Sequence, residues 1–450
     1  MTTCRGQASQ EATQVMTTTR SRPIAVTSTP ERRFTSTIAN VECIAIVNQF
    51  IGQTPSPITD LFSTAKFLRW YREDSSIRTV ITYLGKASNT RGRQASALQR
   101  SGMLMEREQR ELYATIQARL QRPDPHLDQP LLLFVVLFCL LQLMTNRSLN
   151  IGLQIIDQVI RNVVQPRGSR GFSTQIDKSA LSIFRIFEGL GCLLFECGTT
   201  FKAEWCKTVI DVQKSSTPPS RAHNMSLFEC VCTFYGSLAN YNAQTRAWIQ
   251  REEEFITMSG FKSELADHAW PIDAIESTYA EHLAVGQEII RQASDMLESI
   301  QTFEDIVKES KSVQDPSYDM FLSHCYYFRV YTVRLFAHPL WQNARISKET
   351  LHESRVLEYA HSALGHIEKR MQHAGLDAYL YIDHLMMIGI ELKHSLDRLR
   401  VISLLHAIRS QGFVIADVYI DDLQLAWNVV PSSRSSFAVE LPSTNGMLER

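Results

Sequence analysis

The 450-residue sequence lacks the short motifs that identify a catalytic chemistry by their spacing. It has no G-x-x-x-x-G-K-[ST] phosphate loop and no G-x-G-x-x-G turn for a dinucleotide. It also has no G-x-S-x-G elbow for a serine nucleophile and no H-E-x-x-H zinc pair. We therefore predict that the chain is not an enzyme and that it has no catalytic residue, no cofactor and no bound metal.

Long apolar runs and net charge are also scarce. The most apolar run, Leu131–Met144, has 14 residues and includes Gln142, whereas a membrane-spanning helix needs about 20. No hydrophobic signal peptide opens the sequence, and the net charge is −1. Because 44% of the residues are apolar and 21% are charged, the composition is that of a globular protein with a large core and no membrane partner.

Cysteine is present in an odd number, nine, and mostly within apolar segments. That usage favours buried, reduced thiols over a disulfide framework. A zinc site from Cys192, Cys197, Cys206, Cys230 and Cys232 is the alternative. However, continued helical periodicity would point Cys197 into the core, and Cys230 and Cys232 would lie on opposite sides of a helix, so we expect structural cysteines.

Charge is distributed unevenly along the chain. Residues 1–130 carry 17 basic and 11 acidic side chains, whereas the remainder carries 29 basic and 36 acidic ones. A basic front and an acidic body suit a protein that works near DNA, although ordinary scatter of surface charge explains the same numbers. Arg91, Arg93 and Arg100 are candidates for phosphate contacts, but they lack interleaved aromatic residues, so the DNA-binding residues stay unknown.

Hydrophobic spacing predicts an all-α fold, one large helical domain of about 12–16 helices. We divide the chain into a disordered tail (1–40), a mildly basic helical segment (41–128), a helical regulatory domain (129–430) and a flexible tail (431–450). The expected helices include 104–120, 131–144, 149–164 (ended by Pro166), 179–197, 225–258, 271–310, 317–337, 348–373 and 376–393. Residues 85–102 are expected to form a loop or a weak helix start, and Gly412 to supply a left-handed helix cap.

Three groups of titratable residues are candidate sites. Asp417 and Asp421 are four residues apart on one expected helix face, beside Asp422, and would form the carboxylate pair of a helical terpene-cyclase-like enzyme. The three histidines His361, His366 and His373 are spaced too widely for two ligands on one helix face. Glu252–Glu254 is a charge run. The simpler interpretation of all three groups is a solvated helix surface.

The end of the chain resembles a known family. The segment YLYIDHLMMIGIELKHSLDRLRVISLLHAIRSQGFVIADVYIDDLQLAWN (residues 379–428) is similar to the closing part of the fungal-specific transcription factor domain. Its matching features are the small-residue and apolar helix Met386–Glu391, the helix Arg398–Arg409, Gly412-Phe413 and the terminal helix Ala416–Trp427. The segments Tyr327–Pro339 and Gln129–Met144 resemble earlier helices of the same family.

The sequence departs from this family in one important respect. Members usually begin with a Zn₂Cys₆ cluster, and six thiolates are a chemical necessity for that module, whereas the front of this chain holds only Cys4 and Cys43. Because the cluster is absent, the family's DNA-reading role is not carried over to any residue here. The resemblance implies only the regulatory role, that of a nuclear transcriptional regulator of a biosynthetic, secondary-metabolite gene set. Its expected partners are a DNA-binding protein or other regulators, and a small-molecule effector. A helical interaction scaffold and a helical metabolic enzyme are the alternatives.

Overall fold

The computed structural model describes residues 65–89, 95–146, 150–194, 196–201, 221–262, 272–309 and 317–428. Every regular element in these ranges is a helix, so the all-α prediction is confirmed, and the helix number falls in the predicted range. The predicted tails 1–40 and 431–450 lie outside the described residues.

The α-helices are α3 (Ala65–Glu73), α4 (Ser75–Asn89), α5 (Ala95–Leu120), α6 (Leu131–Thr145), α7 (Asn150–Val159), α8 (Gln165–Arg167), α9 (Gln175–Leu194), α11 (Arg221–Lys262), α12 (Ile272–Glu309), α13 (Ser317–Leu335), α14 (Leu340–Asn343), α15 (Val356–Met371), α16 (Tyr381–Glu391), α17 (Ser395–Ser410) and α18 (Ala416–Asn428). A π-helical segment, Ile160–Val164, joins α7 to α8, and 3₁₀ turns precede α6, α9, α15 and α16.

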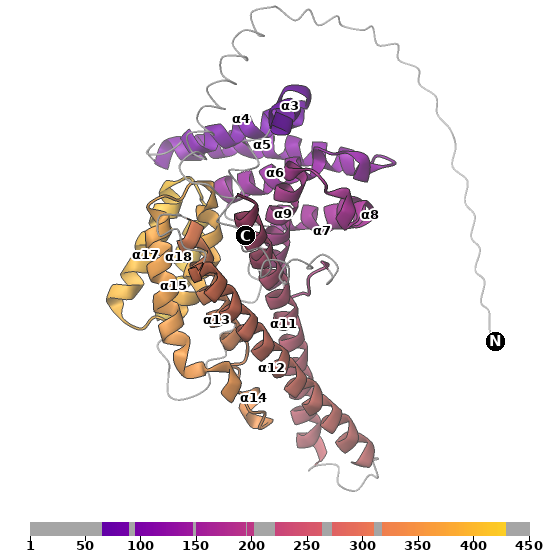
Figure 1. Cartoon of the computed structure of the whole chain (residues 1–450), viewed down its shortest axis with the longest axis vertical. Helices are drawn as coiled ribbons and strands as arrows, with labels where there is room; N and C mark the ends of the chain where they lie inside the picture. Colours follow the sequence, from indigo (N-terminus) through magenta and orange to yellow (C-terminus); the bar gives the residue numbers. More distant parts are fainter. Residues whose placement is uncertain are drawn as a thin grey trace, which may run out of the picture.

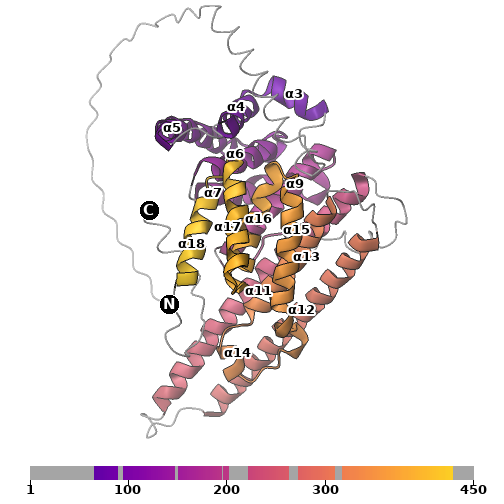
Figure 2. The same ribbon diagram turned by 90° about the vertical axis from the view of Figure 1, so that its left-hand side faces the viewer.

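Three groups of helices stand out around the central part of the molecule (Figures 1 and 2). Helices α3, α4 and α5 lie across one end of the molecule. Helices α13, α15, α16, α17 and α18 stand side by side as a layer, with α13 packed on α15 and α16 packed on α17 and α18. The long helices α11 and α12 pack on each other and extend away from the rest. With 42 residues and a rise of about 1.5 Å per residue, α11 is about 63 Å long.

Helix α6 forms the centre of the core. All its residues from Leu131 to Met144 are buried, because it packs against α4, α5, α7 and α9 and reaches the C-terminal layer. The Ile415 amide donates a hydrogen bond to the Leu143 carbonyl (3.3 Å), which joins α6 to the start of α18. A helix that is apolar on all sides is stable only inside such a shell, so the prediction of a core helix over residues 131–144 is confirmed.

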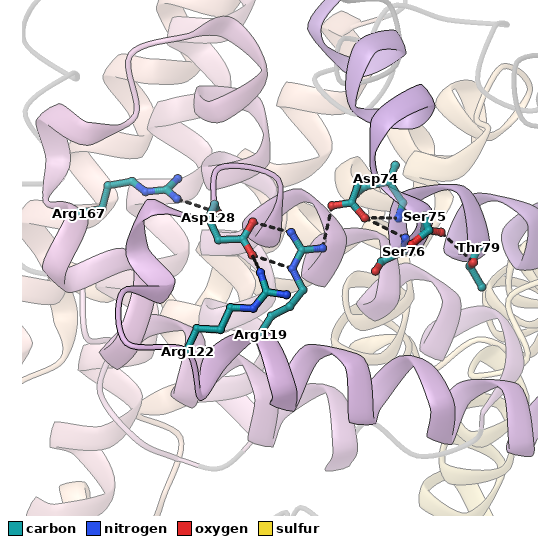
Figure 3. A network of polar contacts seen from close by, with 9 residues as sticks. Asp74, Ser75, Ser76, Thr79, Arg119, Arg122, Asp128 and Arg167 are labelled. Atoms are coloured by element: carbon teal, nitrogen blue, oxygen red, sulfur yellow. Dashed lines mark hydrogen bonds and ion pairs between the residues drawn. The ribbon is translucent and has the colours of Figure 1, made fainter. Parts of the chain in front are cut away.

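A buried ion cluster ties the N-terminal helices to the body (Figure 3). Arg119 of α5 donates to Asp128 (Nε to Oδ2, 2.7 Å) and to Asp74 (Nη1 to Oδ2, 2.8 Å). Asp74 also caps α4, since its Oδ1 accepts from the Ser76 amide at 2.8 Å. Arg167 donates to the Asp128 carbonyl (3.1 Å). One guanidinium thus holds together the α3–α4 junction, α5 and the segment before α6.

The C-terminal helices meet around Gly389 of α16. An added Cβ there would lie 3.0 Å from Leu423 and 3.3 Å from Val401, so a larger residue would require these side chains to shift by a few tenths of an ångström. Trp427 at the end of α18 is half-buried, and its Nε1 donates to the Gly389 carbonyl (2.9 Å). Gly412, with φ 110°, supplies the left-handed residue predicted after α17.

We predict that Trp427→Ala destabilises the domain moderately. A fully buried tryptophan is worth roughly 3–5 kcal/mol, but Trp427 is half-buried, so about 1–2 kcal/mol is expected for the loss of its packing and its hydrogen bond. Chemical denaturation followed by circular dichroism measures the change. Leu425→Ala, at a 64% exposed position on the same helix, is the control, and an equal effect of both changes would show that α18 is not docked through Trp427.

Several predicted helix boundaries are wrong. Residues 85–102 were predicted to form a loop or a weak helix start, whereas α4 runs to Asn89 and α5 begins at Ala95; residues 90–94 lie outside the described residues. Pro166 does not end its helix. The preceding π-helical segment has already changed the hydrogen-bond pattern, and the helix continues to Arg167, where Gly168 (φ 67°) ends it. Helix α9 ends at Leu194, before the predicted residue 197.

The prediction that the charge run Glu252–Glu254 is a solvated surface is wrong for its first residue. Glu252 is buried, and it accepts hydrogen bonds from Tyr279 (3.1 Å) and from His282 Nε2 (3.1 Å) across the α11–α12 pair. The neighbouring Trp248 stacks on His282. It also stacks on Trp341 of α14, with 3.8 Å between the ring centroids. A single buried carboxylate therefore fixes the register of two long helices.

Candidate ligand-binding site

A cavity of about 50 Å³, partly open to solvent, lies where α6, α7, α9, α16 and α18 converge. Most of its wall is apolar, and polar groups reach it from α6, from the turn before α16, from α16 and from α18. The lining residues are Cys139, Gln142, Leu143, Gly152, Ile156, Phe187, Leu190, Gly191, Leu194, Tyr379, Ile382, Asp383, Ile415 and Tyr419. An apolar cavity with a few convergent polar groups is the usual form of a small-molecule site.

Asp383 is the charged group of this cavity. The Tyr327 hydroxyl of α13 donates to its Oδ2, and Tyr327 is the only described residue with a hydrogen bond to this carboxyl. Burial raises the pKa of Asp383 to about 6, and the bond from Tyr327 acts in the opposite direction. At neutral pH the group is therefore a carboxylate, although its surroundings favour the neutral acid.

Two tyrosines complete the polar wall. Tyr379 is buried and stacks on Phe187 (5.2 Å between centroids), yet its hydroxyl has no hydrogen-bond partner in the described structure. An unpaired buried hydroxyl costs free energy, and it calls for an explanation such as a bound water or ligand. Tyr419 of α18 is half-buried, and burial together with the nearby Asp383 raises its pKa.

A buried histidine pair lies behind Asp383. His384 Nε2 is 2.9 Å from the Tyr235 hydroxyl, and the His384 ring stacks on Tyr327 at 3.9 Å. His324 donates from Nδ1 to the Met320 carbonyl (2.8 Å), because a carbonyl can only accept. Burial lowers the pKa of His324 to about 4, and burial together with the nearby His324 lowers the pKa of His384 well below its usual value, so both rings are neutral.

The polar groups at the cavity form two separate hydrogen-bonded pairs. In the described structure, the Tyr235–His384 and Tyr327–Asp383 hydrogen bonds are separate, and neither connects to a serine or cysteine. A nucleophile–base–orienter chain, as in a triad, is not formed by these residues. The lining residues combine one carboxylate (Asp383), one amide (Gln142) and two tyrosines with apolar side chains.

The acidic residues that the sequence singles out do not line the cavity. Asp417 accepts from Arg409 Nε (2.9 Å), while Asp421 is exposed to solvent and Asp422 is half-buried beside it. Their helix, α18, contributes Tyr419 to the cavity instead. No group of three potential metal ligands occurs among the described residues.

The cysteine candidates are dispersed as well. Cys230 and Cys232 are buried in α11, where Cys232 donates to the Ser182 carbonyl (3.3 Å) and burial raises the pKa of Cys230 to about 12. Cys197 is exposed, contrary to the prediction that it points into the core, because α9 has already ended. Cys206 lies outside the described residues.

Two of the candidate histidines pair with carboxylates on neighbouring helices. His361 contacts Asp397 (3.1 Å) and His366 contacts Asp319 (2.7 Å), whereas His373 is exposed. These contacts join α15 to α17 and α13. The basic residues Arg91 and Arg93 lie outside the described residues. Arg100 belongs to the first part of α5.

Sequence reasoning did not select the cavity residues themselves. The signal was present, since Asp383 and His384 interrupt an otherwise apolar stretch (residues 379–390, YLYIDHLMMIGI) of the segment that carries the family resemblance. Ionisable residues inside an apolar helix are costly to bury and hence point to a site.

Comparisons with known proteins add no family. No family model, no curated protein and no solved structure matches the chain. Among the described helices, none has the length and apolarity needed to cross a membrane.

Proposed function

We propose that the chain is a nuclear transcriptional regulator whose helical domain binds a small effector in the Asp383 cavity. DNA contact would come from a partner protein or from the basic N-terminal part. The proposed targets are the genes of a biosynthetic pathway for a secondary metabolite.

One observation carries this proposal. The three segments that resemble the fungal transcription factor domain are far apart in the sequence, yet they contribute to one site. Gln142 comes from the first segment, Tyr327 from the second, and Tyr379, Asp383 and Tyr419 from the third. Three apolar segments need not meet at one cavity merely because they are apolar. Their contribution to a single site therefore supports a common role.

The size and chemistry of the cavity limit the effector. About 50 Å³ holds roughly three or four water molecules or a comparable number of heavy atoms. The ligand is therefore a small molecule, or the end group of a larger one, that donates a hydrogen bond to Asp383. Binding of such a ligand to one arrangement of α16 and α18 would shift the population of the regulator's states.

Deleting the gene in its host and profiling transcripts together with metabolites tests the function. We expect a coherent set of transcripts to change and a wild-type copy to restore it. Leu194→Trp, which fills the cavity, should restore the protein level without restoring those transcripts. Leu425→Trp, on the exposed face of α18, is the matched control and should restore both.

The opposite result identifies an enzyme. If the transcripts stay constant while one metabolite disappears and its precursor accumulates, the chain catalyses that conversion and the regulatory proposal is wrong. If neither profile changes and affinity purification recovers only cytosolic partners, the scaffold alternative replaces it.

A further inference from the structure

The C-terminal end of α9 brings two cysteines together. Glu196 has a left-handed backbone (φ 54°), and the Cys197 amide donates to the Cys192 carbonyl at 3.0 Å. This six-residue hydrogen bond with a left-handed residue before its donor is the Schellman motif, which places the side chains at its two ends in contact. Here both of those side chains are thiols.

The backbone geometry permits a disulfide between them. With the N-to-O distance of 3.0 Å and standard bond lengths, the two Cα atoms are at most about 7 Å apart. Bridged cysteines have Cα separations of about 4.4–6.8 Å. The Cys192 thiol donates to the carbonyl of Gly198 (3.5 Å), the residue after Cys197, and burial, Glu188 and the nearby Cys197 thiol together raise the pKa of Cys192, so the two thiols are close neighbours.

The two thiols differ in accessibility. Cys197 is exposed, whereas Cys192 is 7% exposed. The other free cysteines of the described residues are all buried, namely Cys139, Cys230, Cys232 and Cys325. An oxidant in solution therefore reaches Cys197 first, and its buried neighbour is in place to react next.

We propose that Cys192 and Cys197 form a reversible disulfide, a redox modification site at the end of α9 that takes peroxides as oxidant. The Cys197 thiolate attacks one oxygen of hydrogen peroxide, the O–O bond breaks, and a sulfenic acid and one water result. Cys192 then loses its proton, and its sulfur attacks Cys197. The S–S bond forms, the S–O bond breaks, and the second water leaves. Two electrons pass from the thiols to the peroxide.

The position of this pair connects it to the cavity. Leu190, Gly191 and Leu194 of the same helix end line the cavity. The chain after Cys197 is held nearby, because Glu188 accepts from the Thr200 amide (2.7 Å) and from the Thr199 hydroxyl (2.8 Å). A disulfide would fasten this wall of the cavity covalently.

Peptide mapping of the full-length protein tests the pair directly. Trypsin releases residues 186–202 as one peptide with both cysteines, and residues 222–246 as one peptide with Cys230 and Cys232. After graded hydrogen peroxide and alkylation of the remaining thiols, peptide 186–202 should lose both alkylation sites together and be lighter by two hydrogen atoms. Dithiothreitol should reverse the change.

Variants and the second peptide serve as controls. Peptide 222–246 should stay doubly alkylated, because its thiols are buried in α11. In Cys192→Ser the sulfenic acid on Cys197 should persist and react with dimedone, and in Cys197→Ser the remaining thiol should stay reduced. The proposal is overturned if wild-type Cys197 is oxidised while Cys192 remains a free thiol, if both peptides pair at the same dose, or if neither reacts.

Discussion

Replacing Arg119 with methionine should destabilise the protein by about 3–5 kcal/mol. The Arg119 side chain is 8% exposed and pairs with both Asp74 and Asp128, whose side chains are 15% and 11% exposed. Without the guanidinium, Asp74 keeps only its hydrogen bonds from the first amides of α4, and Asp128 keeps only the longer contact with the exposed Arg122 (3.7 Å). Breaking a buried ion pair from one side costs this much because the uncompensated charge stays in the interior.

The comparison for this prediction is a surface pair on the same helix. Arg107 and Glu111 of α5 form an exposed ion pair with side chains 82% and 63% exposed. Exposed pairs contribute at most about 1 kcal/mol, so Arg107→Met should shift the urea midpoint little. Adding Asp74→Asn and Asp128→Asn to Arg119→Met should recover part of the loss. Equal midpoints for Arg119→Met and Arg107→Met would show that the cluster does not hold the N-terminal helices.

Replacing Asp383 with asparagine should stabilise the protein at neutral pH, which is the reverse of most core changes. The native pKa of about 6 lies above the unfolded value of about 3.9. Between these values the native state binds a proton that the unfolded state has released, so the stability contributed by this group falls as pH rises. Above pH 6 the buried carboxylate costs about 2–3 kcal/mol, and the amide avoids that cost.

The difference in unfolding free energy between the two proteins, measured from pH 4 to pH 7.5, isolates this effect. It should be near zero at pH 4 and reach its full size above pH 6. His324 and His384 act with the opposite sign, since their lowered pKa values remove stability as pH falls, but they are common to both proteins and cancel. Asp305→Asn, at an exposed position, should give a flat difference. A flat difference for Asp383→Asn would mean that the carboxyl is not buried.

A residue that lowers stability is expected where function requires it. If Asp383→Asn gives a more stable protein that fails to restore the transcripts of the deletion strain, the two results together place the carboxylate in the effector site. If Asp383→Asn restores these transcripts fully, the Asp383 carboxylate lowers the stability of the core and has no role in effector binding.

Apolar content and helical periodicity predicted most of the helices, because no alternating strand pattern competes with them in this sequence. Gly412, for example, marked the end of α17 correctly. The errors lie where backbone geometry overrides the pattern. At the end of α9 the helical spacing continues to Cys197, but the left-handed Glu196 turns the chain away.

The cavity was beyond sequence reasoning because its residues come from distant parts of the chain. Only packing brings Gln142, Phe187 and Tyr419 together, and no spacing encodes that proximity. The same holds for Glu252, which belongs to a charged run and is nevertheless buried against His282. A pattern of charges predicts a surface, and it carries no information about a partner on another helix.

The position of α6 also determines when the molecule can finish folding during synthesis. The shell of helices around α6 is complete only when α18, the last described helix, has packed on it. The Leu143 carbonyl of α6 accepts its hydrogen bond from the Ile415 amide at the start of α18. Until α18 has left the ribosome, the wholly apolar α6 therefore has an incomplete covering. Nascent chains should therefore depend on chaperones up to that point, and a premature stop codon before α18 should lead to degradation of the product.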